Sequence, residues 1–186
     1  DAQEIFTLSE LVERFSLERV NKSPAMFDRE KLRWINHQHL KQLPTDQVFL
    51  ALKEQMNFSV DQEWFTGFWG HLGEQFFTLD EVIESIHYFT VSPKQTDEQL
   101  DAEGLQVITM LKEKLAAMSD EHLSEVDFQD ITQEISSQLS VKGRKLFVPI
   151  RLALIGISSG IEIRILVDLL SRSEMLKRID ACLMQS

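Results

Sequence analysis

The residues best suited to binding chemistry lie together between Lys142 and Ile163. Four cations precede or interrupt an apolar run there, namely Lys142, Arg144, Lys145 and Arg151, and a glycine–serine turn follows at Ser158–Gly160. The whole chain carries a formal net charge of −11. A positive cluster on an acidic chain attracts polyanions to one face. We therefore interpret this segment as a binding site for a negatively charged backbone, with the turn close to the groups that the backbone carries.

Positive charge is concentrated in two regions of the chain. Seven Lys or Arg stand against three Asp or Glu between Arg14 and Lys41, and eight against four between Val141 and Ser186. Between Ser92 and Ser140 three cations stand against eleven carboxylates. Two basic regions on an acidic chain would steer a polyanion towards one face while the remaining surface repels it.

Motifs of a catalytic or metal centre are absent from the sequence. It has no glycine-rich phosphate loop, no Gly-x-Ser-x-Gly elbow and no Cys/His set at metal-binding spacing. His37 and His39 are two residues apart on an expected helix, so they point to different faces. The single cysteine, Cys182, has no intrachain disulfide partner, and a lone thiol is typical of a reducing compartment. We expect a cytoplasmic binding protein that holds no cofactor or metal in this chain.

No stretch of about 18 uninterrupted apolar residues is present, so no transmembrane helix or membrane partner is expected. The N-terminus is acidic and has no signal-peptide pattern. Because the chain begins without methionine, in the middle of a pattern, we expect it to be part of a longer protein.

Apolar periodicity predicts helices almost throughout, and sustained two-residue alternation is absent. The predicted helices are Leu8–Phe15, Arg29–Leu43, Thr45–Met56, Asp61–Leu72, one begun by Thr78, one from Thr96 to about Met118, Phe128–Leu139, Val148–Ile155, Ile161–Leu170 and Glu174–Met184. Asp28 is an expected N-cap, and Thr78 with Glu81 and Thr96 with Gln99 are expected capping boxes. The aromatic cluster Trp64–Trp69 has the spacing of a core stripe, which we favour over base stacking.

Pro93 and the polar run that follows it mark the best domain boundary. The predicted fold class is therefore all-α, with two consecutive helical-bundle domains at residues 1–91 and 92–186.

Two stretches of the chain resemble a known family. They are FSLERVNKSPAMFDREKLRWIN, from Phe15 to Asn36, and LFVPIRLALIG, from Leu146 to Gly156. Both are similar to the C-terminal anticodon-binding region of bacterial glutamyl-tRNA synthetases (glutamate–tRNA ligases, class I), and the resemblance covers essentially the whole chain. It implies a monomer that binds tRNA-Glu. ATP and Mg²⁺ would belong to a catalytic domain whose H-I-G-H-like and K-L-S-K-like motifs are absent here, so this chain alone is expected to be inactive.

The resemblance also assigns roles to residues of the second domain. Arg151 matches the family arginine that approaches the first anticodon base, and its alternative role is a salt bridge to a helix carboxylate. The loop that packs against the first two bases corresponds to Ser159, Gly160, Ile161 and Glu162, followed by Ile163. Many relatives carry a His-Gly-Pro-Glu-like sequence there. Lys142, Arg144 and Lys145 are expected phosphate contacts. For Gly156 we favour a helix C-cap, and for Gly160 both a cap and close backbone approach stay open.

In the first domain, Trp34 and Asn36 of the W-x-N motif are candidate contacts to the nucleic acid. Gln75 stands where strictly glutamate-specific relatives tend to carry an arginine for the third anticodon base. An arginine fork only donates, whereas a glutamine amide both donates and accepts. We therefore hypothesise a non-discriminating enzyme that also charges tRNA-Gln. The alternative is a capping or surface glutamine, with specificity determined elsewhere.

Two other functions fit the sequence. A helical protein–protein adaptor is compatible with the acidity and with the amphipathic helix Glu174–Met184. A tRNA-binding paralogue without catalysis is the other alternative.

Overall fold

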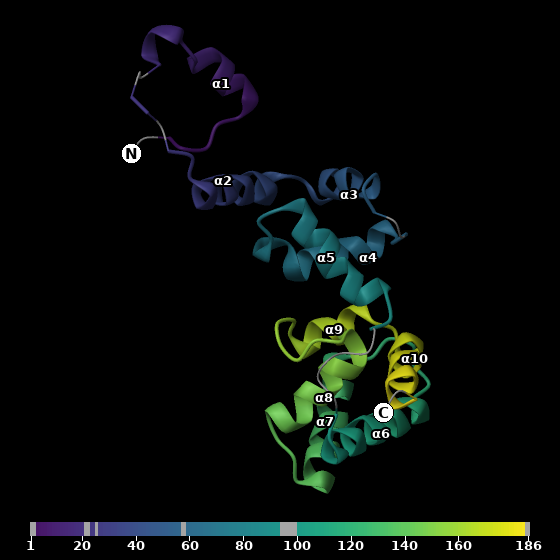
Figure 1. The fold of residues 1–186 in the computed structure, drawn as a ribbon. Helices are drawn as coiled ribbons and strands as arrows, with labels where there is room; N and C mark the ends of the chain where they lie inside the picture. Colours follow the sequence, from purple (N-terminus) through teal and green to yellow (C-terminus); the bar gives the residue numbers. More distant parts are fainter. Residues whose placement is uncertain (1–2, 21–22, 25, 57–58, 94–99, 185–186) are drawn as a thin grey trace. The chain divides into compact units, whose positions relative to one another are not determined.

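The structure is a computed structural model that describes residues 3–20, 23–24, 26–56, 59–93 and 100–184 (Figure 1). Within these ranges it contains ten α-helices, two short 3-10 helices and no strand, which confirms the all-α prediction. The chain divides into two compact units, Asp1–Ile83 and Glu84–Ser186. The division lies inside α5 (Leu79–Thr90), and the domain boundary predicted after Val91 stays a prediction. None of the described helices is long and apolar enough to cross a bilayer.

Five α-helices begin in the first unit. They are α1 (Leu8–Arg14), α2 (Arg29–Gln42), α3 (Thr45–Lys53), α4 (Gln62–Leu72) and α5, with 3-10 helices η1 (Leu17–Arg19) and η2 (Gly73–Gln75). Asp28 caps α2 by accepting a hydrogen bond from the Lys31 N–H, as predicted. At the start of α5 the Thr78 hydroxyl accepts from the Glu81 N–H. A capping box would also have the Glu81 carboxylate accept a hydrogen bond from the N–H of Thr78. Here the carboxylate accepts one from the N–H of Phe77, the residue before Thr78.

The core of the first unit is aromatic. Phe65 and Phe68 of α4 are fully buried, and the Trp69 and Phe76 rings stack with centroids 6.3 Å apart. Phe65 and Phe68 thus confirm the predicted core role of the α4 aromatic cluster, whereas Trp64 and Trp69 at its ends are half-buried. Gly73 makes the arrangement possible, because a Cβ there would lie 2.7 Å from the Trp69 indole.

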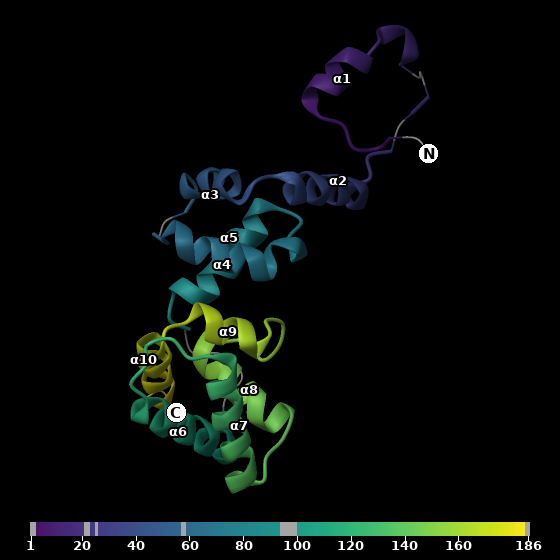
Figure 2. The same cartoon turned by 180° about the vertical axis from the view of Figure 1, so that it is seen from behind.

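The second unit is a bundle centred on α6 (Ala102–Ala117), which packs against α7 (Glu125–Leu139), α8 (Arg144–Ile155) and α10 (Arg172–Leu183). The short α9 (Ile163–Leu169) packs against α7 and α8. The opposite view in Figure 2 shows α6 and α10 next to each other, as in Figure 1. Fully buried aliphatic side chains from four of these helices form the core, among them Leu111, Ile135, Ile150, Leu154 and Ile179.

Three predicted helix starts in this unit were wrong. α7 begins at Glu125, three residues before the predicted Phe128, because Ser124 caps it by accepting a hydrogen bond from the Asp127 N–H. α8 begins at Arg144, one turn before the predicted Val148, and continues through the buried Pro149. α6 begins at Ala102, where Asp101 accepts a hydrogen bond from the Gly104 N–H. The capping box predicted at Thr96 and Gln99 lies outside the described residues.

Candidate nucleic-acid interface

The N-terminal two turns of α8 present a basic and aromatic face. Arg144, Phe147, Val148 and Arg151 follow the i, i+3, i+4, i+7 spacing that places side chains on one side of a helix. The other side of α8 is buried, including Leu146 and Ile150. Burial of the apolar side therefore determines which side chains face outwards, and both arginines are among them.

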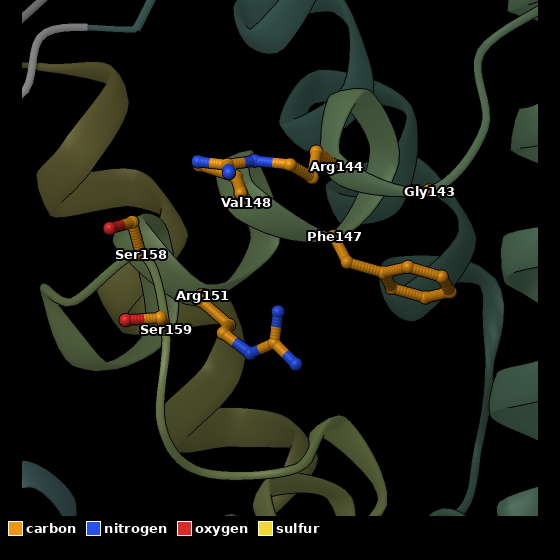
Figure 3. Close-up of a pocket in the computed structure, with 7 residues that line it drawn as sticks. All are labelled: Gly143, Arg144, Phe147, Val148, Arg151, Ser158 and Ser159. Atoms are coloured by element: carbon orange, nitrogen blue, oxygen red, sulfur yellow. The ribbon is translucent and has the colours of Figure 1, made fainter.

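These side chains line an open pocket of about 470 Å³. The glycine that precedes α8 and two serines of the following loop complete its wall; the lining residues are Gly143, Arg144, Phe147, Val148, Arg151, Ser158 and Ser159 (Figure 3). In Figure 3 the Arg144 side chain extends towards Ser158, whereas the Phe147 ring and the Arg151 guanidinium point away from the two serines. The predicted turn and three of the predicted residues, Arg144, Arg151 and Ser159, thus share one site.

The Arg151 side chain holds the loop that follows α8. Its Nε donates a hydrogen bond of 3.0 Å to the carbonyl oxygen of Ile161, and the side chain is half-buried. Among the described residues no carboxylate forms an ion pair with Arg151, so the alternative of a salt bridge was wrong. Because Nε is held by the loop, the terminal N–H groups of the guanidinium have a defined direction.

Glycines define both ends of the turn. Gly156 ends α8 with φ +75°, and its N–H donates to the carbonyls of Arg151 and Leu152, which confirms the predicted C-cap. Gly160 has φ +106°, a conformation that side chains rarely adopt, and it is exposed with Ser159. Since α8 is already capped by Gly156, the role of Gly160 is to let the exposed backbone turn.

The last residues of the loop begin the next helix. Glu162 is the exposed N-cap residue of α9, and its carboxylate pairs with Arg164 at 2.6 Å. Ile163 is the first residue of α9, and both Ile161 and Ile163 are half-buried. The loop therefore presents exposed backbone at Ser159 and Gly160 between two anchored ends.

The three predicted phosphate contacts differ in their surroundings. Lys142 and Arg144 are exposed at the start of α8. Lys145 forms a 2.8 Å ion pair with Glu103 of α6, and the hydrogen bond and negative charge of Glu103 raise the pKa of Lys145. The charge of Lys145 is therefore partly compensated within the chain, whereas no ion pair is found for Lys142 or Arg144 in the part of the chain that the structure describes.

The remaining predicted contacts lie in the first unit. Gln75 is the exposed last residue of η2. Trp34 is 39% exposed on α2. The Asn36 side-chain nitrogen donates to the carbonyl oxygen of Phe77, so this donor is engaged within the chain.

Several residues of these sites were not predicted from the sequence. Phe147 gave no signal because its position in an apolar run resembles that of a core residue. Arg33 and His37 gave none because their partners, the Glu81 carboxylate and the Phe76 carbonyl, are 48 and 39 residues away in the sequence. Arg178, fully buried in α10, gave none because an arginine on an amphipathic helix is usually exposed.

Comparison with known proteins identifies the family. The family model described as "Anticodon binding domain" matches residues 33–183. The chain belongs to the anticodon-binding domain family. This confirms the resemblance inferred from the two motifs.

The anticodon-binding domain has curated relatives that are glutamate–tRNA ligases. It is 31% identical to the ligase of Bdellovibrio bacteriovorus over 97% of this chain, and 31% identical to that of Aquifex aeolicus over 96%. The chain spans about 39% and 40% of the length of these two relatives, and it corresponds to their C-terminal part.

Solved structures share the fold of the anticodon-binding domain. A glutamate tRNA ligase from Elizabethkingia meningosepticum, solved with its amino acid, superimposes with a TM-score of 0.79. The match covers 98% of this chain and 37% of that one, at 20% identity. The glutamate-tRNA synthetase of Elizabethkingia anophelis gives a TM-score of 0.70, also at 20% identity. These matches support the fold.

Proposed function

We propose that this chain recognises the anticodon arm of tRNA-Glu on behalf of a glutamate–tRNA ligase. The observation that carries the proposal is the outward face of α8, where a loop-anchored Arg151 lies beside an exposed glycine–serine turn in a domain of the anticodon-binding family. Unpaired anticodon bases can be bonded along their edges, unlike bases within a helical stem.

In the proposed complex, different residues bind the backbone and the bases. Lys142 and Arg144, with Lys145 in a smaller role, contact phosphates and determine the register of the RNA. Arg151 directs its terminal N–H groups to the edge of the first anticodon base, because a planar fork suits base edges better than a point charge does. The exposed backbone at Ser159 and Gly160 approaches the first and second bases, for which a glycine provides space.

The third anticodon base is assigned to Gln75, which departs from the arginine of strictly glutamate-specific relatives. A carboxamide both donates and accepts hydrogen bonds, so it accommodates the C of a glutamate anticodon and the G of a glutamine anticodon. The proposed consequence is a non-discriminating enzyme that charges tRNA-Gln with glutamate as well. ATP and Mg²⁺ would act in the remaining part of such a ligase, and this chain would supply recognition alone.

A titration of this chain with tRNA-Glu and tRNA-Gln transcripts tests the proposal. We expect binding that weakens steeply with salt, about one log–log slope unit for each phosphate contact. Arg151→Ala should weaken binding of both RNAs, and Gln75→Arg should favour tRNA-Glu over tRNA-Gln. Lys177→Ala, an exposed cation of α10, is the control. A protein–protein adaptor would instead bind without preference for the anticodon arm, and unchanged binding by Arg151→Ala would overturn the site.

A further inference from the structure

The two residues after Gln75, Phe76 and Phe77, are held by one face of α2. The Asn36 side-chain nitrogen donates to the Phe77 carbonyl, and the His37 Nδ1 lies 2.8 Å from the Phe76 carbonyl oxygen. That distance is a hydrogen bond in which the ring nitrogen donates, since a carbonyl can only accept. Consecutive carbonyls of the segment between η2 and α5 are thus fixed by consecutive side chains of a helix.

The opposite edge of the same stretch is fixed by an ion pair. The Phe77 N–H donates to Glu81 over 2.7 Å, and the other Glu81 oxygen pairs with Arg33 Nη2, also at 2.7 Å. The Arg33 guanidinium lies over the Phe77 ring at 4.9 Å from its centroid. His37 stacks on the same ring at 4.7 Å. Arg33, Asn36 and His37 therefore hold both the backbone and the ring of Phe77, and we call these three residues the α2 clamp.

Packing also fixes residues on both sides of Gln75. Gly73 lies against the Trp69 indole so closely that a Cβ would overlap it. Phe76 stacks on Phe68 with centroids 5.9 Å apart and is buried. The exposed Gln75 thus stands between a residue packed under a tryptophan and a residue packed into the core.

We infer that the α2 clamp positions Gln75 for the third anticodon base, and that Asn36 acts on the RNA through this segment. The inference rests on the proposed function. Its physical basis is preorganisation: a side chain on a fixed backbone loses less conformational freedom on binding, so its hydrogen bonds contribute more to affinity.

The test uses two anticodon stem-loop RNAs that differ only in whether the third anticodon position carries a base or is abasic. In the unmodified chain the base should strengthen binding on the order of fivefold, as one neutral hydrogen bond would. Gln75→Ala should remove that gain. Asn36→Ala should remove the gain as well, because Asn36 acts by holding Phe77 and not by contacting the base. Each variant should bind the abasic stem-loop as tightly as the unmodified chain does.

Two substitutions separate positioning from simple packing. Asn36→Asp has the same shape but cannot donate, so it should behave like Asn36→Ala; a packing role would leave it like the unmodified chain. His37→Phe keeps the ring contact with Phe77 but loses the bond to Phe76, and it should also remove the gain. Gln42→Ala, an exposed residue of the same helix, is the matched control and should retain it. His37→Phe keeps the ring packing on Phe77. If an Asn36 variant fails to fold, the third-base gain measured for His37→Phe therefore distinguishes positioning from packing.

The outcomes distinguish the two proposals. If Asn36→Asp and His37→Phe both retain the third-base gain, the clamp has no positioning role and the inference is overturned. If the unmodified chain shows no gain from the third base, the assignment of Gln75 and the inference fail together while the Arg151 site stands. If neither stem-loop binds, the proposed function itself is overturned.

Discussion

Arg178 Nη1 donates a 2.6 Å hydrogen bond to the carbonyl oxygen of Leu154 in the last turn of α8. The same guanidinium donates to the carbonyls of Tyr88 and Phe89 in the last turn of α5 and pairs with Glu174 at 2.8 Å, although the side chain is fully buried. A cation at two helix C-termini satisfies carbonyls that have no intrahelical partner and opposes their partial negative charge. The loop held by Arg151 begins where α8 ends. By bonding the Leu154 carbonyl, Arg178 therefore stabilises the end of α8 from which this part of the candidate interface starts.

Replacing Arg178 by Met should destabilise the second unit strongly. The substitution leaves the carbonyls of Tyr88, Phe89 and Leu154 without this donor and Glu174 without its closest partner. Each buried carbonyl left unsatisfied costs roughly 1–3 kcal/mol. Lys177→Met, on an exposed neighbour, should change stability by less than about 0.5 kcal/mol. Urea unfolding followed by circular dichroism, with hydrogen exchange of the α8 and α10 peptides, measures the difference. Equal midpoints for the two variants would contradict it.

Acid should weaken the first unit through Glu81. Burial raises the pKa of this carboxyl. The hydrogen bonds from Phe77 and Arg33 lower the pKa by more than burial raises it, so the pKa lies below its ordinary value. The folded state therefore binds its proton less tightly than the unfolded chain does. The stabilisation is complete above the unfolded value of about 4.3 and is lost as the pH falls through the lower folded pKa.

Glu81→Gln is the variant that isolates this contribution. At pH 7 it should lower the free energy of unfolding by about 1 kcal/mol, and the difference from the unmodified chain should shrink as the pH falls below about 4. All three tryptophans, Trp34, Trp64 and Trp69, lie in the first unit, so their fluorescence during urea unfolding monitors this unit selectively. A difference that stays constant down to pH 3 would show that Glu81 is not the titrating group.

Gly73→Ala should destabilise the first unit by roughly 1–3 kcal/mol, because the added methyl group overlaps the Trp69 ring and must displace it. Gly70→Ala in the same helical region is the matched control. Nothing lies within 4 Å of the position that its methyl group would take, and alanine is the better helix former by up to about 1 kcal/mol, so it should stabilise. Tryptophan fluorescence again monitors both. Two changes of the same sign would contradict the close approach at Gly73.

Charge removal at the start of α8 should change the salt dependence of tRNA binding unequally. Arg144→Ala and Lys142→Ala should each reduce the log–log salt slope by about one unit. Lys145→Ala should reduce it by clearly less, because Glu103 already compensates the charge of Lys145. Titrations at several salt concentrations give the three slopes, and equal reductions would show that Lys145 leaves Glu103 when RNA binds.

The sequence predicted the helices that have a strong apolar period and a side-chain cap. Asp28 and Thr78 were identified correctly because an N-cap acts over only three residues. The start of α8 was misplaced because proline normally marks a helix start or end. Burial of Leu146, Pro149 and Ile150 against the bundle stabilises the extra turn, and this is a contribution that local sequence does not contain.

The sequence by itself determined the family, the helical class and the cations available for a polyanion, because motifs and composition are carried by neighbouring residues. Only the tertiary structure decided what each polar side chain does. Arg151 and Ile161, Asn36 and Phe77, and Arg178 and Tyr88 are each brought together by the folding of distant segments. A hydrogen bond requires contact within about 3 Å, and for pairs up to 90 residues apart that contact exists only once the core has packed.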